Sequence, residues 1–275
     1  MSTHATVKLR IARQDGPGQT RYWNRFEIPH QPEMNVISCL QAVAANPVTV
    51  DGVRVAPVAW DCNCLEEVCG ACTMLVNRHV RQACTALVDR LVLEDDEIVL
   101  EPMSKVPVMR DLVVERSRMF AALKRVRAWI PVAGYHDAGA GARMSPAEQD
   151  ELYPLSRCMT CGCCTEVCPQ FSKVEVTREA NEPDDQFATR SAAALEGAFL
   201  GAAAISQAVL FNSHPVGKST AAERLAALMG PGGITDCGNA QNCVKVCPKE
   251  IPLTRSIAQA GRQTTLHAIK SWFLK

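Results

Sequence analysis

The feature that most constrains this chain is its set of 14 cysteines, which fall into two groups along 275 residues. Six lie between Cys39 and Cys84, and eight lie between Cys158 and Cys247. The N-terminal segment lacks the apolar stretch of a secretory signal peptide, so the sequence does not point to an oxidising compartment. Clustered thiols in a reducing compartment indicate metal ligands rather than disulfides. We therefore expect metal centres in both halves of the chain.

The balance of charges limits the kinds of partner that fit. Lys plus Arg and Asp plus Glu number 29 each, so the formal net charge is zero. Binding to phosphates needs an excess of basic residues, which argues against nucleic acid as a partner. Hydrophobic residues make up 47% of the sequence, enough to bury a core. The longest apolar stretch, over 191–211, is rich in alanine and contains Glu196, so we expect a buried core helix there rather than a membrane span.

The first cysteine motif is C-x4-C-x2-C, followed after eleven residues by a fourth cysteine. This is the plant-type spacing for a [2Fe–2S] cluster, in which a loop supplies three thiolates and the fourth comes from a nearby strand. Gly70, inside the loop, lets backbone amides approach the cluster sulfides. Zinc also accepts four thiolates, but its usual motif is a pair of CxxC loops. The spacing therefore predicts a [2Fe–2S] site with the ligands Cys64, Cys69, Cys72 and Cys84.

Two further cysteine runs lie in the second half of the chain. The run that starts at Cys158 is an intact C-x2-C-x2-C-x3-C-P motif. In bacterial ferredoxins with two such runs, the fourth cysteine of each run binds the cluster of the other. The run that starts at Cys237 follows the same template, except that Ala240 replaces the second cysteine. Exchange of the fourth ligands assigns Cys158, Cys161, Cys164 and Cys247 to a [4Fe–4S] cluster and leaves Cys168, Cys237 and Cys243 for another centre.

The missing thiolate at Ala240 decides the type of this last centre. A cubane corner iron without its thiolate is easily lost, so three ligands predict a [3Fe–4S] cluster. Water, Asn239 or Gln241 could instead cap a fourth iron, although an amide oxygen is a hard ligand and suits this iron poorly. Three cysteines remain outside the ligand sets, and we expect a core residue at Cys39 and non-ligating thiols at Cys62 and Cys163.

The hydrophobic patterns predict an α+β chain of two domains. In the first, strands are expected over 6–12, 22–28, 74–76, 78–80 and 96–100, with a helix over 36–45 and a tight hairpin at Asn77. Several strands around one helix indicate a β-grasp domain over 1–110. The second domain, 111–275, is predicted to be helical and to follow a hinge at 108–114. Helices are expected over 110–129, 184–211, 220–229 and 253–273, with a capping box at Ser145 and a flexible segment over 134–143.

The three motifs in this order resemble the iron–sulfur subunit of succinate dehydrogenase (succinate:quinone oxidoreductase, complex II) and of fumarate reductase, over nearly the whole chain. That family has a plant-ferredoxin-like β-grasp domain followed by a helical domain like bacterial ferredoxins. The resemblance implies a flavoprotein partner with FAD and a membrane anchor with cytochrome b. Electrons would pass from FAD through the [2Fe–2S], [4Fe–4S] and [3Fe–4S] clusters to a quinone. It also implies an enzyme subunit without substrate chemistry of its own, peripheral on the cytoplasmic side of the bacterial inner membrane.

Two positions depart from the members of that family that use ubiquinone. Those have an aromatic residue five positions after the fourth cysteine of the first run, and a histidine after the first cysteine of the second. This chain has Lys173 and Gly238 there. The stretch from Trp60 to Cys72 looks closer to bacterial members that use menaquinone with a haem-bearing anchor. Pro169 and Lys173 are expected on the quinone side, although a solvated or anchor-facing lysine fits as well. The alternative interpretation is a polyferredoxin-type subunit of another flavoprotein reductase complex.

Overall fold

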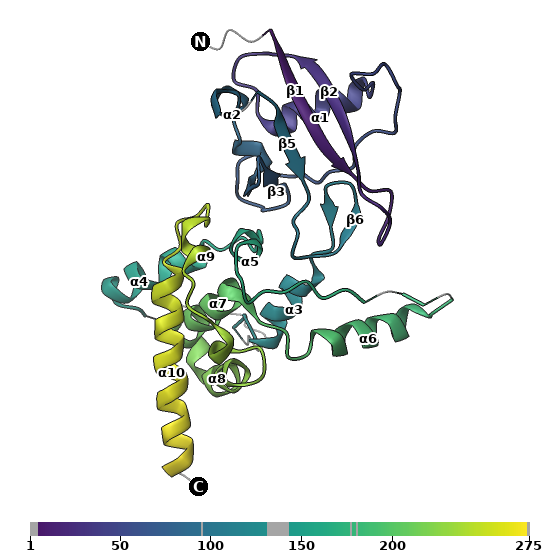
Figure 1. Ribbon diagram of the computed structural model, residues 1–275. Helices are drawn as coiled ribbons and strands as arrows, with labels where there is room; N and C mark the ends of the chain where they lie inside the picture. Colours follow the sequence, from purple (N-terminus) through teal and green to yellow (C-terminus); the bar gives the residue numbers. More distant parts are fainter. Residues whose placement is uncertain (1–4, 95, 131–142, 177, 180, 274–275) are drawn as a thin grey trace, which may run out of the picture. The chain divides into compact units, whose positions relative to one another are not determined.

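The computed structural model describes residues 5–94, 96–130, 143–176, 178–179 and 181–273. It divides into two compact units, Met1–Glu115 and Arg116–Lys275 (Figure 1). Each unit has its own hydrophobic core. The first unit mixes strands and helices, whereas the described elements of the second are all helical. The expected α+β class is therefore confirmed.

The first unit is built around a five-stranded sheet with the strand order β2-β1-β5-β3-β4. β1 pairs antiparallel with β2 and parallel with β5, and β3 pairs antiparallel with β4 and β5. The elements of this unit are β1 (Thr6–Arg13), β2 (Tyr22–Pro29), α1 (Val36–Ala45), β3 (Thr73–Val76), β4 (His79–Gln82), the 3₁₀ turn η1 (Ala83–Thr85), α2 (Val88–Glu94), β5 (Ile98–Glu101), β6 (Val108–Arg110) and β7 (Val113–Val114). Leu9 and Ile11 alternate along β1 and pack in one core with Phe26 of β2 and Leu40 of α1.

The turn between β3 and β4 is the predicted tight hairpin. Asn77 and Arg78 have positive φ values of 48° and 67°, as the two central residues of a type I′ turn require. Asn77 Oδ1 accepts a hydrogen bond from the N–H of Val99 at 2.7 Å, which ties the turn to β5. The second strand begins one residue later than predicted because Arg78 belongs to the turn. The predicted helix over 36–45 is α1, while α2 was not predicted.

The helix predicted over 110–129 is wrong in its first part. Val108 and Val114 pair across the β6–β7 hairpin, and α3 covers only Ser117–Arg125. The chain turns between these strands at Asp111, whose φ of 48° does not fit an α-helix. Both strands of this hairpin belong to the first compact unit.

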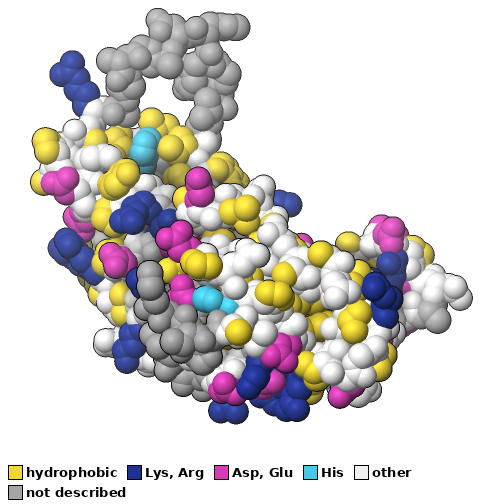
Figure 2. All heavy atoms as spheres, turned by 90° about the horizontal axis from the view of Figure 1, so that it is seen from above, with side chains coloured by type: hydrophobic (Ala, Val, Ile, Leu, Met, Phe, Trp, Pro, Cys, Tyr) yellow, Lys and Arg dark blue, Asp and Glu magenta, His cyan; other side chains and the backbone are white. Residues whose placement is uncertain are grey.

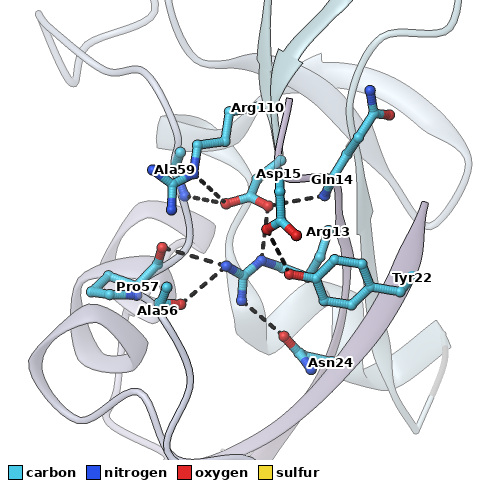
Figure 3. Close-up of polar contacts among 10 residues, drawn as sticks. Arg13, Gln14, Asp15, Tyr22, Asn24, Ala56, Pro57, Ala59 and Arg110 are labelled. Atoms are coloured by element: carbon cyan, nitrogen blue, oxygen red, sulfur yellow. Dashed lines mark hydrogen bonds and ion pairs between the residues drawn. The ribbon is translucent and has the colours of Figure 1, made fainter. Parts of the chain in front are cut away.

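A buried ion pair joins the end of β1 to this turn (Figure 3). Arg13 Nε lies 2.9 Å from Asp111 Oδ1, and each residue is 1% exposed. The carboxylate also accepts hydrogen bonds from the N–H groups of Gln14 at 3.0 Å and Ala59 at 2.8 Å, and Arg13 donates to Asn24 Oδ1 at 2.8 Å. Because the chain runs from Ala59 into the first cysteine loop, this network holds the start of that loop against the end of β1.

The second unit is a group of helices around α7, most of whose residues are buried. Its elements are α3, α4 (Pro146–Ser156), α5 (Cys163–Glu166), α6 (Asp184–Leu195), α7 (Gly201–Ser213), η2 (Gly217–Thr220), α8 (Ala221–Met229), η3 (Ile234–Asp236), α9 (Asn242–Lys245) and α10 (Leu253–Phe273). α4, α8 and α10 pack against α7 (Figure 1). The helices predicted over 220–229 and 253–273 are α8 and α10. The capping box is confirmed, since Ser145 Oγ accepts from Glu148 N at 3.3 Å and Ser145 N donates to Glu148 Oε2 at 2.9 Å.

The single helix predicted over 184–211 is wrong, because α6 ends at Leu195. Gly197 and Gly201 each have a φ of 84°, a left-handed conformation that redirects the chain between α6 and α7. A Cβ atom at Gly201 would lie 3.3 Å from Thr165 Cγ2, so this glycine lets α7 start close to the first cysteine run. The expected buried core helix is confirmed for α7 alone, since α6 has no buried residue. Of the segment predicted to be flexible, residues 134–142 lie outside the described residues.

Charged side chains of both signs are mixed on the face drawn in Figure 2, with hydrophobic side chains between them. This mixture agrees with the equal numbers of basic and acidic residues in the sequence. Among the helices that the structure describes, none combines the length and the hydrophobicity needed to cross a membrane.

Candidate iron–sulfur sites

The first cysteine loop, between α1 and β3, turns its backbone N–H groups toward a thiol. Leu65 and Glu67 have positive φ values of 62° and 56°, and such left-handed residues make neighbouring N–H groups converge on an anion. The N–H groups of Glu66 and Val68 lie 3.4 and 3.3 Å from Cys64 Sγ. These two hydrogen bonds are the main reason that the pKa of Cys64 is lowered to about 7. The loop therefore stabilises negative charge on a sulfur atom.

The middle of the loop repeats this arrangement at Cys69. The N–H of Ala71 lies 3.4 Å from Cys69 Sγ. Gly70, between them, has a φ of 71°, so its predicted role in bringing amides toward sulfur agrees with its conformation. Thr73 Oγ1 donates to the Gly70 carbonyl at 2.9 Å, which holds the end of the loop on β3. Cys62, two residues before the motif, is exposed to solvent.

The β3–β4 hairpin brings the fourth cysteine of this motif next to the third. Cys84 lies in η1, directly after β4, and the N–H of Ala83 donates to the Cys72 carbonyl at 3.1 Å. Burial raises the pKa of Cys84 to about 12, and its hydrogen bond with Cys72 adds to the shift. Cys72 Sγ in turn lies 3.6 Å from Oε1 of the buried Gln82. Sequence analysis did not single out Gln82, since nothing in its spacing marks it.

The four thiols predicted to bind the [4Fe–4S] cluster line one small cavity next to the first run of the second unit. Cys158, Cys161, Cys164 and Cys247 all line it. Burial raises the pKa of Cys164 well above its usual value, and the charges of the other three cysteines raise it further. Four thiols within electrostatic range of one another, one of them from the distant run, fit the predicted exchange of ligands between the runs. The fit is chemical as well, because thiolates are the preferred ligands of iron–sulfur clusters.

Within this set, Cys161 has the environment most favourable to a thiolate. Hydrogen bonds from the side chain and the N–H of Cys163, with a smaller contribution from the charge of Arg116, hold its pKa at about 7 although burial opposes this. The guanidinium of Arg116 also donates from Nη2 to the Cys161 carbonyl at 2.6 Å. Neither Arg116 nor the role of Cys163 was predicted, because both depend on side-chain contacts that spacing does not reveal.

The two runs share one backbone conformation, position by position. Thr160 and Gly162 in the first run have φ values of 52° and 91°, and their counterparts Asn239 and Gln241 have 51° and 60°. The short helices α5 and α9 both start on the fifth residue after the first cysteine. This match places Ala240 at the position equivalent to Cys161, as the sequence template requires.

The second run encloses another cavity, lined by three thiols and by Ala240. Cys168, Cys237 and Cys243 are the lining thiols, as the exchange of ligands predicts. Burial raises the pKa of Cys243, and the charges of Cys168 and Cys237 add to the shift. Asn239 and Gln241, the amides considered as alternative ligands, also line this cavity.

Of the two residues expected on the quinone side, one lines the cavity of the second run and the other does not. Pro169 lines the cavity of the second run, whereas Lys173 forms an ion pair with Glu175 and is not among the lining residues. Gly238 also lines the cavity, and a Cβ atom there would lie 2.6 Å from Gln170 Nε2. The Gln170 side chain thus occupies the space next to the position where ubiquinone-using relatives have histidine.

In the part of the chain that the structure describes, no three His, Cys, Asp or Glu residues are grouped closely enough to bind a single metal ion. This does not argue against clusters, because the thiolates of a cluster are shared among several iron atoms: one per iron in [4Fe–4S] and [3Fe–4S], and two per iron in [2Fe–2S]. Cys39 is fully buried in α1, and burial raises its pKa to about 12, so the predicted core residue is confirmed.

Loops that direct N–H groups at sulfur, together with two interleaved thiol runs on a helical unit, define an iron–sulfur protein whose chemistry is electron transfer. Two family models agree with this class: a 2Fe-2S iron-sulfur cluster binding domain matches residues 8–121, and a 4Fe-4S dicluster domain matches residues 154–251. The chain is 48% identical to the succinate dehydrogenase iron-sulfur subunit of Bacillus subtilis, over 99% of this chain and 98% of that protein. The chain belongs to the family of the iron–sulfur subunits of succinate dehydrogenase and fumarate reductase, so the predicted family and the electron-transfer role are confirmed.

More distant relatives extend this result. The chain is 26% identical to the fumarate reductase iron-sulfur subunit of Wolinella succinogenes, over 88% of this chain and 89% of that protein. The fold is similar to that of a chain in the Mycobacterium smegmatis Sdh1 complex in the apo form, with a TM-score of 0.66. That match has 21% identity and covers 94% of this chain and 95% of the other, so it concerns the fold alone.

Proposed function

We propose that this chain conducts electrons from the FAD of a flavoprotein partner, through [2Fe–2S], [4Fe–4S] and [3Fe–4S] clusters, to a quinone at a cytochrome b membrane anchor. Each cluster, when bound, accepts and releases one electron at a time. The residues of this chain hold the clusters, donate hydrogen bonds to their sulfur ligands and limit the access of water. Oxidation of succinate would take place on the flavoprotein partner. The chain would then lie on the cytoplasmic side of the bacterial inner membrane as part of the complex.

The proposed ligands are those that the cysteine spacing predicts. Supporting observations are the N–H groups around Cys64 and the grouping of thiols around two cavities of the second unit. For the first domain we propose a β-grasp fold over 1–110, and the strand order β2-β1-β5-β3-β4 supports it. For the second we propose a helical fold of the bacterial ferredoxin type over 111–275. The ligand sets are Cys64, Cys69, Cys72 and Cys84; Cys158, Cys161, Cys164 and Cys247; and Cys168, Cys237 and Cys243.

The observation that carries the proposal is the matched backbone of the two runs, with Ala240 where the first run has Cys161. A loop of the same type that lacks one thiol can hold a cluster with one iron fewer. The substitution Ala240→Cys should therefore convert the third centre to [4Fe–4S], because it restores the ligand in a loop that already has the required conformation. The oxidised [3Fe–4S] signal in low-temperature EPR should disappear, and the iron content should rise by one atom per chain.

Ala240→Ser is the matched control, since it adds a side chain of similar size with a hard oxygen donor. It should leave the [3Fe–4S] signal in place. If Ala240→Cys also left that signal unchanged, the register assigned to the second run would be wrong.

The partner is tested by EPR on air-oxidised membranes that contain the complex, before and after addition of succinate. We expect an oxidised [3Fe–4S] signal that succinate abolishes, while a reduced [2Fe–2S] signal appears. Clusters that do not respond to succinate would instead indicate the alternative, a polyferredoxin-type subunit of another flavoprotein reductase.

For the quinone we propose menaquinone, with Pro169 and Lys173 on the quinone side. Support comes from Pro169 in the wall of the third site and from Gly238 in place of a histidine. Lys173→Gln should raise the KM for a menaquinol analogue without changing reduction of the clusters by succinate. An unchanged KM would remove Lys173 from the quinone side.

A further inference from the structure

The side chain of Arg116, at the start of α3, contacts the backbone of the first cysteine run and not its own helix. It is the N-cap residue of α3, but its side chain makes no capping hydrogen bond to the first turn of that helix. The guanidinium instead reaches a residue 45 positions away, where Nη2 donates to the Cys161 carbonyl at 2.6 Å. The Nε atom of the same guanidinium is buried. This is a short, charge-assisted hydrogen bond to the backbone of a proposed cluster ligand.

We propose that Arg116 is a positioning residue that raises the reduction potential of the [4Fe–4S] centre, by holding a permanent positive charge against the Cys161 loop. The inference rests on the proposed function, because it takes Cys161 to be a ligand of that centre.

The physical reason is electrostatic. Reduction adds one electron to the centre, and a fixed cation close to a ligand stabilises the reduced state more than the oxidised state. Arginine keeps its charge at any physiological pH, and a partly buried charge is screened less by water and salt than an exposed one.

Other charged residues near the Cys161 site do not duplicate this arrangement. Lys249 lines the same cavity, whereas the hydrogen bond to the Cys161 carbonyl comes from Arg116. Glu166, at the end of α5, is a buried acid whose negative charge would act in the opposite direction. Arg118 lies two residues further on, with its guanidinium 3.7 Å from the centre of the Phe171 ring, where it packs in the core.

The test compares Arg116→Gln with Arg116→Lys in the purified complex, by EPR-monitored redox titration of each cluster. Gln still offers an N–H donor for the Cys161 carbonyl but carries no charge. Lys keeps the positive charge but lacks the planar guanidinium group with its several N–H donors. We expect Gln to reduce the equilibrium constant for one-electron reduction of the [4Fe–4S] centre at least tenfold, which is a fall of about 59 mV. Lys should keep the potential close to that of the unchanged protein, and the [3Fe–4S] potential should not move in either variant.

Arg125→Gln is the matched control from the same helix. Arg125 also binds backbone carbonyls, those of Ala198 at 3.1 Å and of Pro231, but none in a cysteine run. This variant should lose stability without a shift in the [4Fe–4S] potential.

Equal potentials in Arg116→Gln and the unchanged protein would overturn the proposal. Equal shifts in the Gln and Lys variants would also overturn it, because they would indicate an effect of loop geometry rather than of charge.

If the Arg116→Gln variant did not retain the iron of this site, the Arg116→His variant would be measured in its place. The potential of the His variant should then fall between pH 6 and pH 9 by more than that of the unchanged protein, and an equal fall would overturn the proposal. Absence of cluster signals from the unchanged protein would be a failure of the proposed function instead, so the two failures are distinguishable.

Discussion

Substitution of Asp111 by Asn tests how the first cysteine loop is held. Asp111 has a φ of 48°, a conformation that Asn tolerates nearly as well as Asp does, so the change does not add backbone strain. It removes the negative charge opposite Arg13, which is 1% exposed. It also turns one oxygen, an acceptor for the N–H of Gln14 or of Ala59, into an NH₂ group. Arg13 keeps its hydrogen bonds to Asn24 and to the Ala56 carbonyl (Figure 3), but the buried cation loses its counter-ion and at least one buried N–H group loses its acceptor.

The magnitude follows from the burial of both partners. Breaking a buried ion pair by removing one partner costs about 3–5 kcal/mol in the free energy of unfolding. At about 4 °C per kcal/mol for a unit of this size, the Tm of the first unit should fall by roughly 12–20 °C. Replacing Arg13 by Met in the Asp111→Asn background removes the unpaired cation, and should recover at least about 2 kcal/mol.

The assay is thermal unfolding of the full chain with its clusters, followed by the visible circular dichroism of the [2Fe–2S] centre. Arg25→Gln is the control, since Arg25 of β2 forms a surface pair with Glu97, the residue before β5. Such a surface pair contributes at most about 1 kcal/mol. If Asp111→Asn changed the Tm no more than Arg25→Gln did, the buried pair would not be what holds the loop. If the double variant recovered nothing, the loss would not come from the unpaired Arg13.

Two other predictions concern the glycines and the thiols. Gly232→Ala should lower the free energy of unfolding of the second unit by about 2–4 kcal/mol. A left-handed φ costs about 1–2 kcal/mol for a residue with a Cβ atom, and this Cβ would lie 2.2 Å from the Ala198 carbonyl oxygen. Gly261→Ala, with open space around it in α10, should instead stabilise the protein by about 0.5–1 kcal/mol. In the iron-free chain, alkylation of Cys64 by iodoacetamide should rise about tenfold per pH unit below pH 7 and level off above it, since its pKa is about 7 and only the thiolate reacts. Cys39, buried and with a pKa of about 12, should stay unmodified throughout, as peptide mass spectrometry would show.

Chemical denaturation of both glycine variants decides the first of these predictions, and equal effects at the two glycines would contradict it. A rate of Cys64 alkylation that kept rising to pH 9 would show that the loop amides do not stabilise its thiolate.

Much of the site could be predicted from the sequence because its determinants are local. A cluster loop needs thiols at short, fixed intervals, so the intervals after Cys64 and Cys158 identified candidate ligands directly. The missing cysteine at Ala240 could be recognised for the same reason, because the two runs follow the same spacing template. The hairpin at Asn77 and the capping box at Ser145 were also predictable, because a turn or a helix start is set by a few adjacent residues.

The features that sequence analysis missed depend on residues far apart in the chain. The break between α6 and α7 depends on the left-handed conformation of Gly197 and Gly201 and on the close approach of Gly201 to Thr165, whereas the local sequence was interpreted as one continuous helix. Arg13 and Asp111 are 98 positions apart, and nothing near either residue indicates that they are buried together. The same holds for Arg116 and Cys161.

The sequence by itself therefore determined which family the chain resembles, and it predicted the candidate thiols of each site and the division of the ligand sets between the runs. Only the tertiary structure decided which charges and amides surround those thiols and how the loops are held. The physical reason is that covalent spacing fixes a ligand set within a few residues. The electrostatic environment of a site, in contrast, is the sum of side chains and dipoles that folding brings together from the rest of the unit.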